Sequence, residues 1–186
     1  MLQTILELVD PSKDRDGLEV GHFEILRAED LPEPYRSLLV HASDMTPTLE
    51  AFFESAVHLR VLHRRRRGDT LHRTVLLCID GSDRPVELGA IEIHLDRFEA
   101  PAKEEVLQCW LPLGAILQKR SIAHVCQPQA YFRCQASGVV GKALGPRETG
   151  LFGRFNVLLD LEGRNLARAV EILPPIVPAG RGPDPA

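Results

Sequence analysis

The chain contains the sequence Leu-His-Arg-Thr-Val-Leu-Leu-Cys-Ile at residues 71–79. This stretch is rich in aliphatic residues and lies between a Gly-Asp pair and an Asp-Gly pair, which predicts a strand bounded by two turns. Before it, the apolar residues Val57, Leu59 and Val61 alternate with His58, Arg60 and Leu62, and residues 86–95 read as a further strand after it. Three strands joined by short turns form an antiparallel meander, which we expect at the centre of the fold.

Helical patterns come before these strands and directly after them. Residues 34–41 carry apolar side chains at helical spacing, and a second helix is expected to start with Thr46 as its N-cap and Pro47 in its first turn. Residues 103–110 and 112–117 predict two more short helices. Further along, the sequence predicts strands at 121–126 and 130–135, a glycine-rich loop at 138–153, and a closing hairpin of 155–161 and 166–173. Consecutive strands without regular βαβ alternation predict an α+β fold with an antiparallel sheet.

Length and composition indicate one globular domain. The chain has 186 residues, a net charge of −4, 44% hydrophobic residues and 26% charged residues. The negative charge argues against a nucleic-acid partner or an anionic membrane, and the basic run at residues 64–67 is expected to be a solvated turn. We expect an N-terminal extension at residues 1–30, the folded domain at 31–174, and a flexible Pro/Gly-rich tail at 175–186.

No targeting or cofactor motif is recognisable. No apolar stretch approaches the roughly 20 residues needed to span a bilayer, and the N-terminus lacks the features of a signal peptide, so we expect a cytoplasmic protein. The four cysteines form no CxxC pair and are expected to be free buried thiols. The histidines form no motif with metal-ligand spacing, and no phosphate-binding loop occurs, so we expect neither a metal nor a cofactor.

Arg73 is the most informative residue of the central strand. Strands alternate faces with a period of two, so Arg73 shares its face with Leu71, Val75, Leu77 and Ile79. An arginine on such an apolar face needs a partner, because an unpaired buried charge is very costly. The partner is either the carboxylate of a ligand, which a guanidinium binds through two parallel hydrogen bonds, or an internal Asp or Glu. A third possibility is an arginine that reaches the solvent from the start of the strand.

Glu171 poses the same question near the C-terminal end. Its face of the expected strand carries the apolar residues Ala167, Ala169 and Leu173. A carboxylate in such a position is either paired with an arginine or kept for hydrogen bonding and acid–base work. Arg168 is an unsuitable partner because it points to the opposite face of the strand, so a structural role for Glu171 would be an ion pair with Arg73 or Arg154 that holds the sheet together.

Five segments resemble the chorismate pyruvate-lyase family, in the same order and at similar intervals. They read Leu-Leu-Val-His-Ala-Ser-Asp-Met-Thr at 38–46, Leu-His-Arg-Thr-Val-Leu-Leu-Cys at 71–78, Leu-Pro-Leu-Gly-Ala-Ile-Leu at 111–117, Gly-Leu-Phe-Gly-Arg at 150–154 and Val-Glu-Ile-Leu-Pro at 170–174. Together they span most of the chain. Residues 121–149 depart from the family pattern by their greater length, and the first 30 residues match no part of it.

The resemblance implies an antiparallel sheet of about six strands, flanked by helices and enclosing a ligand cavity. It implies that Met45, Arg73, the backbone of Leu113 and Glu171 line that cavity. The activity implied is removal of pyruvate from chorismate, without a cofactor, to leave 4-hydroxybenzoate. Arg73 would bind the ring carboxylate with help from a backbone N–H at Leu113 or Gly114. Glu171 would accept a hydrogen bond from the ring hydroxyl, and Met45 would pack against the ring.

A second function is compatible with the same residues. The fold also resembles the ligand-sensing domains attached to some bacterial transcription regulators, so the chain could be a binding or sensor module for an aromatic carboxylate, without catalysis. An inactive carrier and a lyase acting on another enol ether are further alternatives. The sequence does not separate these readings, and it does not distinguish a 4-hydroxybenzoate product from the 3-isomer.

Overall fold

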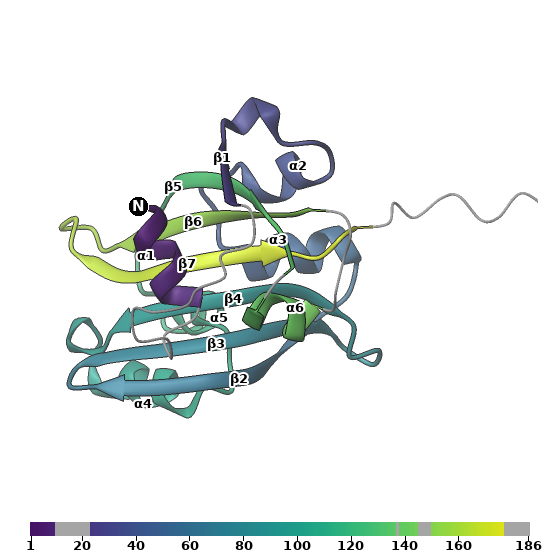
Figure 1. Ribbon diagram of the computed structural model, residues 1–186. Coiled ribbons are helices and arrows are strands. Elements are labelled where there is room, and N and C mark those ends of the chain that lie inside the picture. The colour runs from purple at the N-terminus through teal and green to yellow at the C-terminus, as the bar shows by residue number, and fades with distance from the viewer. Residues whose placement is uncertain (10–22, 137, 145–149, 177–186) are drawn as a thin grey trace, which may run out of the picture.

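The computed structural model describes residues 1–9, 23–136, 138–144 and 150–176. Its centre is one antiparallel sheet of seven strands in the order β1-β5-β6-β7-β4-β3-β2 (Figure 1). The strands are β1 (Phe23–Leu26), β2 (Val57–Arg67), β3 (Thr70–Ile79), β4 (Pro85–His94), β5 (Val125–Cys134), β6 (Leu151–Leu159) and β7 (Asn165–Leu173). The predicted α+β class with a single antiparallel sheet is therefore confirmed.

Two features of the sheet differ from the sequence prediction. The segments 121–126 and 130–135 were expected as two strands, but one strand, β5, runs from Val125 to Cys134, and residues 121–124 precede it without strand structure. The register of β5 shifts between Pro128 and Ala130. Pro128 lacks an N–H for the ladder, and this irregularity lets the chain continue in the same strand. The short strand β1 was not predicted; it pairs with the end of β5 at one edge of the sheet.

Helices cover both faces of the sheet. Helices α1 and α6 lie on one face, and α3, α4 and α5 lie on the other, which we call the site face (Figure 1). The helices are α1 (Leu2–Val9), α2 (Tyr35–Leu39), α3 (Met45–Phe53), α4 (Ala100–Gln108), α5 (Leu113–Lys119) and α6 (Gly138–Leu144). No helix in the described part of the chain is both long and apolar enough to cross a membrane.

Two helices correct the sequence prediction. Helix α6 occupies part of the expected loop at 138–153; its buried residues Val140 and Leu144 pack in the core, so tertiary contacts outweigh the two glycines of this short helix. Helix α3 begins at Met45, with Asp44 as its N-cap, instead of using Thr46 in that position.

The expected N-terminal extension contributes α1 and β1 to the fold, and Ile5 and Leu8 of α1 are buried. Most of the expected tail, residues 177–186, lies outside the described residues.

The two faces of the sheet carry different hydrophobic clusters. The face under α1 and α6 has one cluster, to which β3 contributes Leu76 and Cys78. The site face has two clusters. One joins Leu71 to helices α4 and α5, and the other joins Leu77 to helices α2 and α3. Arg73 and Val75 lie between these clusters on the same face of β3, which leaves room for a pocket in the middle of the site face.

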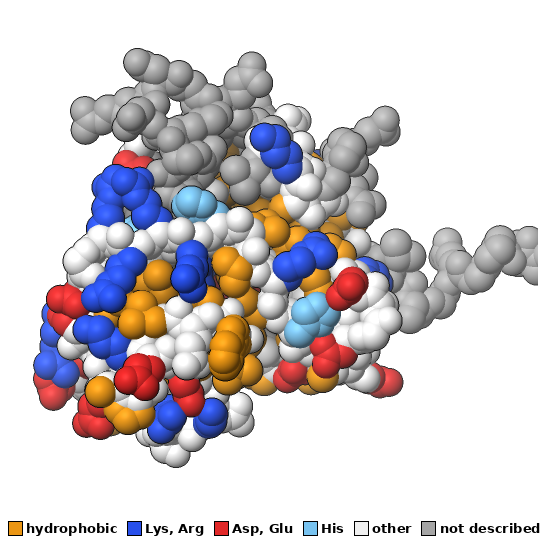
Figure 2. Space-filling view, turned by 90° about the horizontal axis from the view of Figure 1, so that it is seen from below, with side chains coloured by type: hydrophobic (Ala, Val, Ile, Leu, Met, Phe, Trp, Pro, Cys, Tyr) orange, Lys and Arg blue, Asp and Glu red, His pale blue; other side chains and the backbone are white. Residues whose placement is uncertain are grey.

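The basic run at residues 64–67 lies within β2, not in the turn that was expected. The turn itself is the two-residue connection Gly68-Asp69, in which Gly68 has a φ of +57° that suits glycine. The four arginines are exposed along an edge strand. Figure 2 views this side of the molecule, and basic side chains are interspersed there with acidic and hydrophobic ones.

Candidate functional site

A pocket opens on the site face between the two hydrophobic clusters. It has about 580 Å³ of empty space, its open mouth included. Strands β2, β3, β4, β6 and β7 form its floor, and the starts of helices α3 and α5 form its walls. The lining residues are Asp44, Met45, Thr46, Leu59, Arg73, Val75, Leu77, Glu87, Gly89, Ala90, Ile91, Pro112, Leu113, Gly114, Asn156, Leu158, Ala169 and Glu171. All five residues that the sequence analysis selected are among them, and we call this cavity the central pocket.

The strand register brings distant residues together on the floor of this pocket. Arg73 lies opposite Ile91, which in turn lies opposite Ala169. In the adjacent row Gly89 lies opposite Glu171, and Glu171 lies opposite Arg154 of β6. Residues directly opposite in an antiparallel sheet point to the same side, so both rows face the helices α3 and α5. The sheet thereby places Arg73 and Glu171 in neighbouring rows.

Arg73 is a buried cation, and few polar groups of the protein interact with its charge. Its side chain is only 3% exposed, and its one hydrogen bond to the backbone runs from Nη1 to the carbonyl oxygen of Leu111 at 3.3 Å. Its Nε atom is buried without a partner, and no carboxylate of the described residues forms a salt bridge with it. Burial lowers the pKa of Arg73, but a guanidinium keeps its charge in proteins. The internal salt bridge considered above is therefore not formed within the described residues.

Glu171 is paired, and its partner is Arg154. Nε of Arg154 donates to Oε2 of Glu171 in a charge-assisted hydrogen bond. Arg154 is fully buried, and it also donates to the backbone carbonyl oxygens of Leu39, His41 and Ser43. It thus connects β7 to the segment that leads into helix α3. The described residues provide no second hydrogen bond to Glu171, which leaves Oε1 available at the pocket.

Glu87 is a third ionisable group of the central pocket. Its side chain is buried, and Oε2 has no hydrogen-bond partner. Burial, together with the nearby Glu171 carboxylate, raises the pKa of Glu87 well above its usual value, so the site favours the neutral form of this carboxyl group. A neutral carboxyl group can donate a hydrogen bond as well as accept one. Gly89 makes room for it, since a Cβ at Gly89 would lie 3.1 Å from Oε1 of Glu87.

The pocket walls hold the remaining predicted residues. Met45 is the first residue of α3 and is 4% exposed, while Leu113 and Gly114 form the start of α5. Gly114 permits a close approach between the two helices, because a Cβ there would lie 3.1 Å from Cβ and Cγ of Asp44. The apolar side chains of Val75, Leu77, Ile91 and Leu158 complete the wall.

The structure adds residues that the sequence analysis missed. Glu87 could have been found, because it alternates with Gly89 and Ile91 on one face of a strand otherwise rich in apolar residues. Arg154 was considered, together with Arg73, as an internal partner of Glu171, and the structure shows the pair with Arg154. Asn156, whose Oδ1 is buried without a partner, gave no signal in the sequence.

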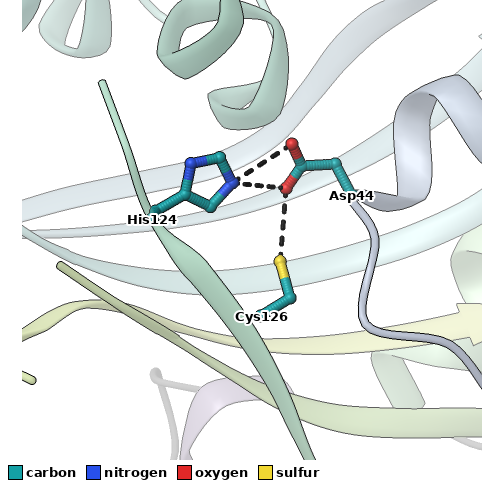
Figure 3. A group of neighbouring side chains, drawn as sticks. All are labelled: Asp44, His124 and Cys126. Carbon is teal, nitrogen blue, oxygen red and sulfur yellow. Dashed lines mark hydrogen bonds and ion pairs between the residues drawn. The ribbon is translucent and has the colours of Figure 1, made fainter. Parts of the chain in front are cut away.

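A second polar cluster borders the central pocket and consists of Asp44, His124 and Cys126 (Figure 3). Nε2 of His124 lies 3.1 Å and 3.2 Å from the two carboxylate oxygens of Asp44. Sγ of Cys126 lies 3.4 Å from Oδ1 of the same carboxylate. Burial, and then the Asp44 charge, raise the pKa of the Cys126 thiol to about 12. These residues have the types and the proximity of metal ligands.

Comparison with known proteins yields matches in structure only. No family model matches the chain, and no curated protein matches its sequence. The chain is similar to PhnF from Mycobacterium smegmatis, with a TM-score of 0.54 and 15% identity over 73% of this chain and 65% of PhnF. The effector domain of the same protein gives a TM-score of 0.54 and 16% identity over 71% of this chain and 88% of that domain.

A third structure is the ligand-binding domain of a Bordetella bronchiseptica protein assigned to the GntR family of transcriptional regulators. It has a TM-score of 0.49 and 13% identity over 63% of this chain and 85% of that domain. The two PhnF matches show a shared fold. They do not show membership of the chorismate pyruvate-lyase family in particular.

Proposed function

We propose that this domain binds a small aromatic carboxylate in the central pocket and acts as a receptor, not as a lyase. The observation that carries the proposal is the buried guanidinium of Arg73, which faces the pocket without a carboxylate partner from the described residues. A charge buried in this way costs several kcal/mol unless something pairs with it. An anionic ligand supplies that pairing when it binds.

The other lining residues define the chemical class of the ligand. Apolar side chains on the strands and helices suit the faces of a ring, while Arg73 suits a planar carboxylate with two oxygens. In the neutral form that burial favours, Glu87 can donate a hydrogen bond to a further polar group of the ligand. The fold that the chain shares with the effector domain of PhnF supports a receptor role by analogy of fold alone.

The test is calorimetry with 4-hydroxybenzoate, 3-hydroxybenzoate, benzoate and the neutral benzamide, on protein kept in chelator. We expect the carboxylates to bind and benzamide to bind at least about 10-fold more weakly, because it lacks the charge that pairs with Arg73. Equal affinity for benzoate and benzamide, or no binding of any carboxylate, would refute the proposal.

Chorismate pyruvate-lyase activity is the second candidate. It is favoured by one observation, the presence of the Glu171 carboxylate in the same pocket as Arg73. Its charge is, however, already paired with Arg154, which is the structural role considered as the alternative in the sequence analysis. Incubation of the protein with chorismate, followed by chromatography, distinguishes the two functions. A receptor leaves the rate of chorismate breakdown unchanged, whereas a lyase forms pyruvate and a hydroxybenzoate in equal amounts.

A further inference from the structure

The cluster of Asp44, His124 and Cys126 is assembled from two distant parts of the chain. Asp44 precedes helix α3, while His124 lies just before β5 and Cys126 lies within that strand (Figure 3). Each residue offers one ligand atom, and the three atoms lie within 4.8 Å of one another. Cys126 is buried, and the side chains of His124 and Asp44 are 15% and 19% exposed.

The hydrogen bonds of His124 show that a proton or a metal ion must lie between its ring and the Asp44 carboxylate. Nδ1 of His124 lies 3.0 Å from the carbonyl oxygen of Ile122, which can only accept, so Nδ1 carries a proton. Nε2 then faces both oxygens of the Asp44 carboxylate. Two acceptors at this distance require a proton or a metal ion between them. A backbone carbonyl that fixes the far nitrogen of a histidine is also the usual outer-shell partner of a metal-bound imidazole.

The distances from the Asp44 carboxylate to the other two ligand atoms are close to those of tetrahedral coordination. Metal–ligand bonds of about 2.0–2.3 Å at tetrahedral angles separate nitrogen, oxygen and sulfur ligands by about 3.3–3.6 Å. The contacts in the cluster are 3.1 Å and 3.2 Å between nitrogen and oxygen and 3.4 Å between sulfur and oxygen. The third separation, between Nε2 of His124 and Sγ of Cys126, is within 4.8 Å, so an ion would bind once these two side chains draw together around it.

The position of Asp44 shows that its carboxylate is directed to this cluster and not to its own helix. Asp44 is the N-cap residue of α3, where aspartate commonly accepts a hydrogen bond from a backbone N–H of the first turn. Its side chain makes no such capping bond. The carboxylate instead contacts His124 and Cys126, and Gly114 of α5 leaves space beside it.

We propose that Asp44, His124 and Cys126 bind one divalent ion of the zinc class, with a fourth coordination position open to the central pocket. A set of one sulfur, one imidazole and one carboxylate favours Zn²⁺ or Co²⁺ over Ca²⁺ and Mg²⁺, which take oxygen ligands. The carboxylate and the thiolate balance the two positive charges of the ion, so a partly buried site carries no net charge. Asp44 also lines the pocket, which directs the fourth position toward it. Binding releases the thiol proton and any proton on Nε2.

The experiment is a Co²⁺ titration of reduced protein that has first been stripped with chelator. We expect one equivalent of Co²⁺ to produce a thiolate-to-cobalt charge-transfer band and the visible bands of tetrahedral cobalt. Cys126→Ser should abolish the charge-transfer band, and His124→Gln and Asp44→Asn should each weaken binding by at least about 100-fold. Cys134→Ala is the matched control, because this thiol is buried on the opposite face of the sheet and should leave the spectrum unchanged.

Circular dichroism and thermal unfolding establish that each variant is folded before titration. If Cys126→Ser does not fold, His124→Gln provides the decisive measurement, since its side chain is partly exposed. Folded wild-type protein without a stoichiometric cobalt spectrum would overturn the proposal. A charge-transfer band that persists in folded Cys126→Ser, or that disappears in Cys134→Ala, would overturn it as well. Because the carboxylate measurements are made in chelator, failure of the metal site and failure of the receptor function are seen separately.

Discussion

Replacing Arg73 by methionine should make the empty protein more stable while it removes the binding function. The guanidinium is 3% exposed, has one long hydrogen bond to Leu111 and leaves Nε without a partner. A buried polar group without a partner costs about 1–3 kcal/mol, and methionine fills similar space without that cost. Arg73→Met should therefore raise the free energy of unfolding by about 1–3 kcal/mol. For a chain of this size that corresponds to an increase of about 2–12 °C in Tm.

Ligand binding should change in the opposite direction. A hydrogen bond to a charged group contributes about 1.5–3 kcal/mol, so Arg73→Met should weaken 4-hydroxybenzoate binding by about 10–140-fold. Arg73→Lys should lose a similar amount, because lysine retains the charge but not the planar pair of donors. Calorimetry gives the affinities, and thermal unfolding of the ligand-free protein gives Tm.

Arg154→Met is the matched control, because Arg154 is a buried arginine that is paired. Its removal leaves Glu171 without a cation and should cost about 3–5 kcal/mol. Opposite signs of the Tm change in the two variants identify Arg73 as a ligand-binding residue. The reasoning is refuted if Arg73→Met lowers Tm by several degrees and binds 4-hydroxybenzoate as tightly as the wild type.

Three more changes test the pocket. Glu171→Gln should lower stability by about 3–5 kcal/mol in thermal unfolding, because it leaves Arg154 without a charge partner, and Arg154→Met should restore part of that loss if the two residues are coupled. The raised pKa of Glu87 means that its contribution to stability is complete below about pH 4.5 and is lost as pH rises toward the raised pKa, by about 1.4 kcal/mol per pH unit. Glu87→Gln should therefore gain stability over the wild type as pH rises in denaturant unfolding, and a difference independent of pH would contradict this assignment. Gly89→Val should weaken carboxylate binding at least about 10-fold by filling the pocket floor, whereas unchanged calorimetry would show that the ligand lies elsewhere.

The sequence located part of the site because one-dimensional patterns report burial. Alternation around Arg73 and Glu171 predicted which face of each strand is covered by other parts of the protein. A charged residue on such a face indicates a special role, because burying a charge is unfavourable in free energy. The resemblance added Met45, Leu113 and Gly114, and all five residues line one pocket. Their roles in binding or catalysis remain predictions.

The partners of these buried charged residues could not be predicted in the same way. The sequence left open whether Arg73 or Glu171 has an internal partner, and the register between β6 and β7 settles one case by placing Arg154 opposite Glu171. A shift of one residue would have turned Arg154 to the other face, and such a shift leaves the composition of both strands unchanged.

The sequence by itself determined the fold class and the presence of unusual charges in a covered sheet, since periodicity and turn chemistry are local properties of the chain. Only the tertiary structure decided which charges meet. It brought His124 and Cys126 to Asp44, 80 and 82 positions away, and it left Arg73 without a carboxylate among the described residues. The physical reason is that pair energies fall off with distance in space, which strand order and helix packing determine and which no local pattern encodes.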